Sequence, residues 1–360
     1  MKINTITIQN YKSIKEIDAL PLTNLNLLIG ANGAGKSNFI SFFKMLNMMI
    51  EKRFQEYVKV SGGADSILHF GSKHSSEIYA KVDFHNNAYS FHLKSTDQNN
   101  LFFAEEATPY IGANVIGRAN DETNLFETKG SKVRGPGYKG VSDYVIEALQ
   151  SWRVYHFHDT SSTAGVKKLC DVSDNRMLRP DASNLASFLY LLKEKYPDSF
   201  FIIEETIKLI APYFDRFILE PDSFNPEKIR LEWREVGSDH YFNATHLSDG
   251  TLRMMCLATL LLQPNAPDTV IIDEPELGLH PYAITVLASL MKSFAVDKQL
   301  IVSTQSVTLI NHFSPEDVIV TEKEDGASVF RRLDENELNE WKDEYSLGEI
   351  WEKNIIGGTP

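Results

Sequence analysis

One short stretch near the N-terminus limits the folds open to this chain more than any other feature. It follows the pattern G-x-x-x-x-G-K-[ST] and consists of Gly30, Ala31, Asn32, Gly33, Ala34, Gly35, Lys36 and Ser37. An aliphatic run, residues 24–29, precedes it, and apolar residues then recur at helical spacing: Phe39, Phe42, Phe43, Leu46 and Met49. A strand, a glycine-rich turn and a helix in this order predict an α/β fold with a phosphate-binding loop.

The residue types in this loop suit a nucleotide. Glycines allow the backbone N–H groups to surround phosphates, and the helix N-terminus adds a favourable dipole. Lys36 would supply a positive charge, and the Ser37 hydroxyl would ligate Mg²⁺. We place Asn38, the next residue of the helix, in the same nucleotide-binding set.

A second acidic element complements the loop. The aliphatic run 270–272 ends in Asp273 and Glu274. A carboxylate at the end of a buried strand is the second Mg²⁺ ligand of P-loop enzymes, which we assign to Asp273. Glu274 is then placed to orient and deprotonate an attacking water, so we assign it as a catalytic residue together with Lys36.

Composition narrows the class of protein further. The 360 residues include 36 basic and 49 acidic side chains, a net charge of −13 that disfavours wholesale coating of nucleic acid. The chain has two cysteines, Cys170 and Cys256, without a pairing framework. Its longest apolar run, 254–262, is far shorter than the roughly 20 residues of a membrane span. We therefore expect a reduced, cytoplasmic protein without a membrane segment.

The chain divides by pattern into a core and insertions. Strand patterns occupy 77–84, 88–94, 101–105 and 153–157, helical patterns occupy 181–214, and short buried strands follow at 269–272 and 299–302. We expect a single domain over 1–360 with a core at 1–55 and 240–335. A β-rich segment, 56–160, and a helical lobe, 161–239, would be inserted, and 336–360 would form a C-terminal helix.

With these motifs the chain resembles the stand-alone ABC-type ATPases of the RecF/SMC/OLD class, including bacterial ATPases associated with anti-phage defence. Five further stretches carry the resemblance: 8–13, which includes Lys12; 247–251, which resembles the signature loop; 276–281, which resembles the D-loop; 303–306; and 345–358. Residues 55–240 match only loosely. The resemblance implies an ATPase head with the β-rich and helical insertions above, ATP and Mg²⁺ as ligands, and Lys12 near the nucleotide.

The resemblance also implies an oligomer. In this class the signature loop, here Ser248 and Gly250, closes on the ATP held by the opposite protomer. The chain carries one phosphate loop and one signature loop, so a complete site would need a head-to-head homodimer that holds two ATP molecules. If residues 247–251 are considered without the other motifs, the alternative interpretation is that they form an ordinary helix cap.

Gln305 stands at the switch position, where most ABC ATPases carry histidine, and we include it among the candidate catalytic residues. Glutamine keeps a hydrogen bond but cannot titrate near neutral pH. We therefore predict slow turnover and a long-lived closed dimer. The alternative is that glutamine is the normal switch residue of this subgroup.

Two other groups have more than one interpretation. His156 and His158 lie on one face of a strand, as in metal sites, but no third ligand follows at motif spacing, which favours structural roles. A basic set could contact the phosphates of DNA, or could simply be solvated; it comprises Lys129, Lys132, Arg134, Lys139, Lys167, Lys168, Arg176 and Arg179.

The spacing of the motifs bears on the role of the ATPase. Lys36 and Ser248 are 248 − 36 = 212 residues apart. This spacing is longer than that between the same motifs in transporter ATPase subunits, and it is too short to hold the long coiled-coil arms of SMC proteins. No two aspartates lie two residues apart, so a Toprim nuclease domain is not expected. The resemblance favours the sensor or motor subunit of a bacterial defence system, acting with a separately encoded, nuclease-like effector. The alternatives are a RecF-like DNA-repair ATPase that binds duplex DNA and a switch, independent of DNA, that gates a toxin.

Overall fold

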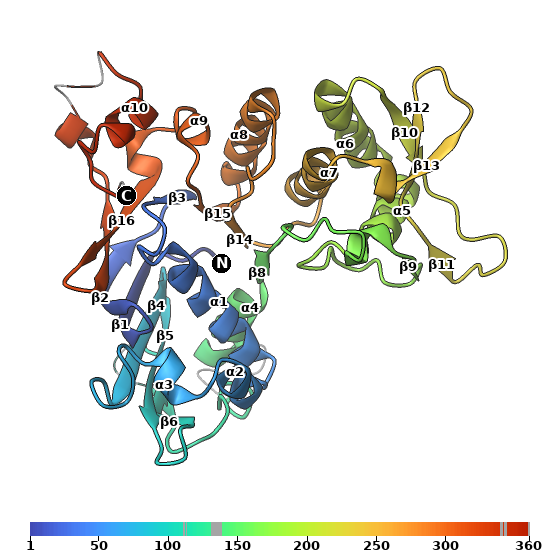
Figure 1. Cartoon of the computed structure of the whole chain (residues 1–360). Helices are drawn as coiled ribbons and strands as arrows, with labels where there is room; N and C mark the ends of the chain where they lie inside the picture. Colours follow the sequence, from blue (N-terminus) through green and yellow to red (C-terminus); the bar gives the residue numbers. More distant parts are fainter. Residues whose placement is uncertain (111, 113, 131–138, 339–340, 342–343, 359–360) are drawn as a thin grey trace.

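The computed structural model of the chain describes residues 1–110, 112, 114–130, 139–338, 341 and 344–358. Figure 1 shows a body that contains both chain termini and, beside it, a lobe built from the green and yellow middle of the sequence. The body contains two sheets, and the phosphate-binding loop lies in it.

A mostly parallel sheet forms the centre of the body. Its order is β17-β16-β3-β15-β14-β8, and only β17 runs antiparallel to its neighbour. The strands are β3 (Leu25–Ile29), β8 (Trp152–Tyr155), β14 (Thr269–Asp273), β15 (Gln299–Ser303), β16 (Val318–Glu324) and β17 (Ala327–Arg332). Val270 and Ile272 pack into one apolar cluster and Ile271 into another, so both faces of β14 are covered. Burial on both faces explains why these strands are continuous aliphatic runs.

The second sheet is antiparallel, in the order β2-β1-β4-β5-β6-β7. Its strands are β1 (Thr5–Tyr11), β2 (Ile14–Pro21), β4 (Glu77–Phe84), β5 (Asn87–Ser95), β6 (Leu101–Ala107) and β7 (Val115–Gly117). Every second residue of β4 is buried, as expected for a sheet with one covered face.

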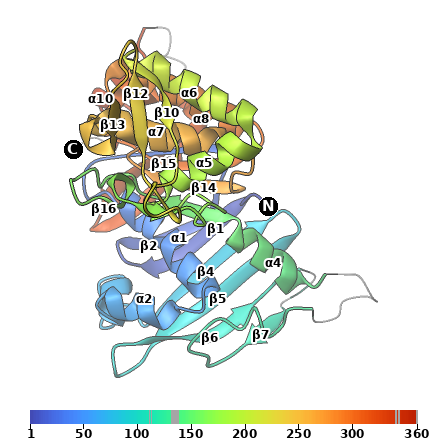
Figure 2. The same ribbon diagram turned by 90° about the vertical axis from the view of Figure 1, so that its right-hand side faces the viewer.

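Helices fill the space between the sheets and cover the far face of the parallel sheet. Figure 2 shows α1 (Lys36–Ile50) crossing the antiparallel sheet near α4 (Val141–Gln150). The five apolar residues that predicted this helix are all at most 1% exposed. The short helices α2 (Phe54–Val60) and α3 (Ala64–Ile67) follow α1.

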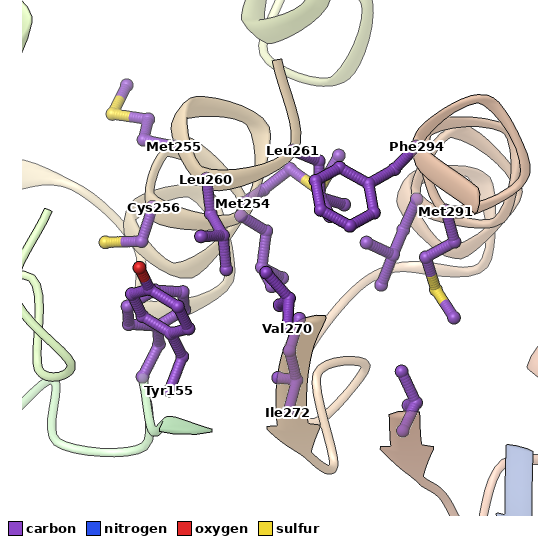
Figure 3. Packing of buried hydrophobic residues seen from close by; sticks show 14 of the residues in the cluster. Tyr155, Met254, Met255, Cys256, Leu260, Leu261, Val270, Ile272, Met291 and Phe294 are labelled. Carbon is purple, nitrogen blue, oxygen red and sulfur yellow. The ribbon is translucent and has the colours of Figure 1, made fainter. Parts of the chain in front are cut away.

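The opposite face of the parallel sheet is covered by α7 (Asp249–Leu262) and α8 (Pro281–Ala295). Figure 3 shows side chains of both helices in the same apolar cluster as Val270 and Ile272 of β14; among those labelled are Met254, Leu260 and Leu261 of α7 and Met291 and Phe294 of α8. Because α1 belongs to the other apolar cluster, α1 and α7 lie on opposite faces of this sheet.

The lobe combines two helices with small sheets. Its helices are α5 (Leu185–Lys195) and α6 (Pro197–Ile210). Its strands are β9 (Cys170–Asp171), β10 (Phe214–Ile218), β11 (Lys228–Ile229), β12 (Glu232–Glu235) and β13 (Tyr241–Asn243). Short 3₁₀ helices occur at Gly165–Lys167, Ala244–His246, Pro315–Asp317 and Glu335–Leu338, and the short helices α9 (Val307–Ile310) and α10 (Leu347–Glu352) complete the fold.

The structure differs from the expected segment boundaries in two places. β8, expected within the inserted β-rich segment, instead pairs with β14 in the parallel sheet, with Tyr155 opposite Ile272. Conversely β1, expected in the core, pairs with β4 of the antiparallel sheet. An alternating or aliphatic pattern identifies a strand but does not specify its partner strand, which explains both differences.

The expected C-terminal helix over 336–360 is also wrong. In the described part of this segment, a 3₁₀ turn ends at Leu338 and α10 begins only after Ser346. The backbone N–H and the hydroxyl of Ser346 both donate to the Glu349 carboxylate, a capping box that starts a new helix. Gly357 and Gly358 follow at φ 77° and 75°, which is not helical.

Candidate functional site

The phosphate-binding loop connects β3 to α1, as the sequence predicted. Gly33 and Gly35 have φ values of 78° and 123°, which side chains other than glycine rarely adopt. The loop closes through a hydrogen bond from the Ala34 N–H to the Ala31 carbonyl (3.2 Å). A Cβ at Gly33 would meet nothing within 4 Å, so the loop leaves open space at its turn.

Lys36 is the first residue of α1 and is 5% exposed. Its ammonium donates to the backbone carbonyls of Gly30 (2.5 Å) and Ala31 (3.1 Å). Burial lowers the pKa of Lys36, and the carboxylates that follow β14 oppose this shift, Glu274 most strongly. Ser37, the next residue, is exposed on the first turn of the helix. A cation and a hydroxyl therefore lie on the same turn.

The predicted acidic pair lies at the end of β14. The Asp273 carboxylate accepts a hydrogen bond from the hydroxyl of Ser303, its partner on β15. Glu274 has a φ of 42°, an unusual conformation for a residue with a side chain, and its N–H donates to the Ser303 carbonyl (2.9 Å). Strained backbone of this kind clusters at functional sites. The Gln305 side-chain amide donates to the Glu274 carboxylate, so the structure brings together these two predicted catalytic residues.

Sequence reasoning assigned no role to Glu276, which connects the acidic segment to the switch segment. Its side chain is buried, and Oε1 accepts from the Thr304 hydroxyl (2.5 Å) and the Gln305 N–H (3.2 Å). Oε2 has no hydrogen-bond partner, and burial raises the pKa of this carboxyl. Glu276 therefore fixes the backbone of Gln305, whose side chain holds Glu274.

A cavity of about 740 Å³ opens at the start of α1. Lys12, Ser13, Asn38 and Phe70 are among the residues that line it. The Asn38 side-chain amide donates to the Ser13 hydroxyl (2.7 Å), and the Lys12 ammonium donates to Ser41 (2.9 Å). Burial is the main cause that lowers the pKa of Lys12. Both Lys12 and Asn38 thus lie beside the phosphate-binding loop.

Phe70 was not singled out from the sequence. Its ring is 59% exposed and it has a φ of 55°. The only signal was an aromatic residue before Gly71 in a loop, which is too common a pattern to identify a site.

The signature-like segment lies at the start of α7. The Ser248 hydroxyl caps this helix by accepting from the Thr251 N–H (3.1 Å). A Cβ at Gly250 would lie 2.5 Å from the carbonyl oxygen of Gly278, so glycine allows the helix and the D-loop-like segment to touch. Because α7 and α1 cover opposite faces of the parallel sheet, Ser248 and Gly250 are not placed beside the phosphate-binding loop of the same chain.

Ser37 and Asp273 offer a hydroxyl and a carboxylate oxygen, donor types that suit Mg²⁺, a hard cation that prefers oxygen ligands. Fold and site together define the protein as a P-loop ATPase with an ABC-type head. The family comparison then identifies it: residues 25–311 match the AAA domain family described as "putative AbiEii toxin, Type IV TA system", and the chain belongs to this family.

Solved structures agree with this fold. The SMC head bound to the C-winged helix domain of ScpA matches with a TM-score of 0.61 and 14% identity, over 93% of this chain and 99% of that one. The Smc head with an extended coiled coil from Pyrococcus furiosus, bound to the C-terminal domain of ScpA, matches with a TM-score of 0.58 and 12% identity. That alignment covers 95% of this chain and 98% of the other. The predicted ATPase-head fold, similar to that of SMC heads, is confirmed.

No curated protein sequence matches the chain. In the described residues, every helix is too short or too polar to cross a bilayer.

Proposed function

We propose that this ATPase hydrolyses Mg-ATP at the edge where β3, β14 and β15 end, and that two chains close on the nucleotide. The observation that carries the proposal is the contact between Gln305 and Glu274 at this edge. The Glu274 carboxylate is also close enough to the Lys36 ammonium for their charges to interact. A carboxylate held next to a cation and a Mg²⁺-binding residue is suited to phosphoryl transfer to water.

Each residue has a defined task in this proposal. Lys36 leaves the loop carbonyls and stabilises negative charge on the phosphates, while the loop N–H groups hold the phosphate oxygens. Ser37 and Asp273 hold Mg²⁺, which neutralises developing charge when bound. Glu274 orients and deprotonates the water, and Gln305 keeps its carboxylate in position.

The cavity lined by Lys12, Asn38 and Phe70 is the proposed site of the nucleoside. It begins at the same helix turn that would hold the phosphates, and Phe70 offers an exposed aromatic face. Aromatic rings stack on nucleobases with little dependence on base identity. Lys12 would add positive charge on the phosphate side of the cavity.

The position of the signature-like segment supports dimer closure. Ser248 and Gly250 start a helix on the sheet face opposite α1, which suits contact with ATP held by a second copy of the chain. A capped helix N-terminus suits a phosphate. We therefore propose a head-to-head homodimer that holds two ATP molecules.

We further propose that the ATPase is the sensor or motor subunit of a bacterial defence system and acts with a separately encoded effector. The family description, which names a toxin of a type IV toxin–antitoxin system, supports this context. A RecF-like role on duplex DNA has weaker support, because several described members of the basic set already have partners. Lys139 pairs with Glu147, Arg179 with Asp174 (2.5 Å), and Lys167 is largely buried. Lys132 and Arg134 lie outside the described residues.

The first experiment measures phosphate release and mass in solution. Glu274→Gln should bind ATP, release little phosphate and form a dimer with Mg-ATP, whereas Lys36→Ala should not bind ATP. Glu220→Gln, an exposed glutamate after β10, is the matched control and should behave as wild type. Normal turnover in Glu274→Gln would overturn the assignment.

The dimer is tested in the Glu274→Gln background. Adding Ser248→Arg should keep the chain monomeric while it still binds ATP, because the arginine blocks only the surface that meets the second chain. Ser238→Arg, on the exposed β12–β13 hairpin, should still dimerise. Dimers of the Ser248→Arg variant would contradict the proposed interface.

The partner is tested by comparing turnover with and without linear duplex DNA, and with and without the protein encoded beside this gene. We expect DNA to leave turnover unchanged and the neighbouring protein to bind in a nucleotide-dependent way. Stimulation by DNA alone would favour the RecF-like role instead, and an effect of neither would favour the switch that gates a toxin.

A further inference from the structure

Two histidines lie beside Asp273 at the end of the parallel sheet. β8 runs parallel to β14 with Tyr155 opposite Ile272, so His156 and Asp273 each follow directly at the same edge. Phe157 points into the apolar core, which leaves His156 and His158 on the other side of the segment. Ligand atoms of His156, His158 and Asp273 all lie within 4.8 Å of one another. Sequence spacing offered no third ligand because Asp273 is more than a hundred residues away.

The backbone that carries the histidines is held firmly. The His156 N–H donates to the Pro180 carbonyl (2.9 Å). From α7, the buried Arg253 guanidinium donates to the carbonyls of Phe157 (2.9 Å) and His158 (3.3 Å). These bonds use only main-chain atoms of the two histidines, so both imidazole rings remain available to a ligand.

The His156 ring has an unmet bonding requirement. Its Nε2 is shielded from solvent and has no hydrogen-bond partner. Buried polar atoms nearly always have a hydrogen-bond partner, so a shielded ring nitrogen without one is open to an ion or a water molecule. Metal ions bind the neutral form of an imidazole ring.

The ligand set selects a type of metal. Two imidazoles and one carboxylate suit borderline divalent ions such as Zn²⁺, Co²⁺ and Fe²⁺, whereas Mg²⁺ prefers oxygen ligands only. The Lys44 ammonium faces the cluster, and Lys44 and Lys36 both interact electrostatically with Asp273.

We propose that His156, His158 and Asp273 form a binding site for a divalent transition-metal ion, separate from the Mg²⁺ site at Ser37 but sharing Asp273 with it. Three protein ligands leave coordination positions for water or for another ligand. All three ligands come from one chain, so the site can form without a second copy.

Metal binding is tested on the nucleotide-free full-length protein after removal of any polyhistidine tag. Co²⁺ is titrated in the presence of excess Mg²⁺, followed by visible absorption and by calorimetry. Wild type should bind one Co²⁺ per chain. His156→Gln and His158→Gln should each weaken Co²⁺ binding by at least about 10–100-fold. This is the loss typical when a residue that only supports a metal ligand is removed, and removing a ligand itself should cost no less. His240→Gln, an exposed histidine before β13, is the matched control.

Two further variants separate the possible causes. Ser37→Ala removes the Mg²⁺ ligand on α1 and should leave Co²⁺ binding unchanged, whereas Asp273→Asn should weaken it. Circular dichroism is used to check that each variant folds. If His156→Gln does not fold, the test rests on His158→Gln, which should fold because His158 is only half-buried. Equal Co²⁺ affinity in wild type and His158→Gln, or loss of binding in excess Mg²⁺, would overturn the proposal. ATP binding, measured separately with Mg²⁺, shows whether the nucleotide site fails independently.

Discussion

Substituting alanine for Gly30 should destabilise the protein far more than substituting alanine for Gly33, although both glycines belong to the same loop. Gly30 has a φ of 153°, and a Cβ there would lie 2.2 Å from the backbone carbonyl oxygen of Thr321 on β16. β16 pairs with β3, so relieving this clash means moving two buried strands apart. Backbone strain of about 1–3 kcal/mol and overpacking of about 1–3 kcal/mol together predict a loss of about 2–6 kcal/mol.

Gly33 is the matched control. Its φ is 78°, but a Cβ there meets nothing within 4 Å. The left-handed conformation costs about 1–2 kcal/mol, and the stiffer unfolded chain returns about 0.4–1 kcal/mol, so the net loss should be about 0–1.6 kcal/mol, centred at about 0.8.

The assay is urea unfolding followed by circular dichroism. With an m value of about 3 kcal/mol per molar urea, the centres of the two ranges, about 4 and about 0.8 kcal/mol, place the midpoint of Gly30→Ala about 1 M below that of Gly33→Ala. Equal midpoints would refute the argument, because they would mean that β3 and β16 separate without cost at this position.

Four further variants test the site and its surroundings. Phe70→Ala should weaken ATP binding about tenfold without changing stability, because base stacking contributes about 1–3 kcal/mol. The control Phe224→Ala, in the lobe, should bind ATP as wild type does, and equal affinities in the two variants would exclude stacking on Phe70. Glu276→Leu should slow turnover because the Thr304 and Gln305 donors lose their acceptor, and Glu276→Gln should largely restore it; equal loss in both would contradict a positioning role. Gln305→His should accelerate phosphate release if the missing titratable group limits turnover, and an unchanged rate would favour glutamine as the normal switch residue. Burial raises the pKa of Glu106, so its stabilising contribution is present below the unfolded pKa of 4.5 and is lost as the pH rises through the folded pKa. The free energy of unfolding of Glu106→Gln should therefore fall less than that of wild type as the pH rises from 4.5, and identical pH profiles would contradict this.

The Glu106 prediction depends on a closed hydrogen-bond network. Its carboxylate lies on β6 and accepts from the Tyr89 hydroxyl (2.6 Å), the Thr123 hydroxyl (2.5 Å) and the Asn124 N–H (2.7 Å). Glutamine can keep its oxygen toward Asn124 and donate to the two hydroxyls, so the variant should fold.

The amino-acid sequence by itself determined the local chemistry of this protein. The strand–loop–helix around Lys36 and the aliphatic strand that ends in Asp273 were predicted correctly, because each depends on residues that are neighbours in the chain. A glycine-rich turn before a helix indicates a phosphate-binding loop, and an aliphatic run before two carboxylates indicates a buried strand with an acidic end. Neither interpretation depends on the rest of the fold. The helical face of α1 followed from its 3.6-residue period for the same reason.

Tertiary structure decided which of these local pieces meet. β8 lies in the parallel sheet rather than in the insertion, and only that placement brings His156 to Asp273. Because β15 lies beside β14, Gln305 contacts Glu274, and this arrangement reveals the role of Glu276. The pairing of β1 with β4 also could not be predicted from the sequence. Strand order depends on packing between segments far apart in the chain, and a local hydrophobic period records only that a strand has a buried face, not which strand lies beside it.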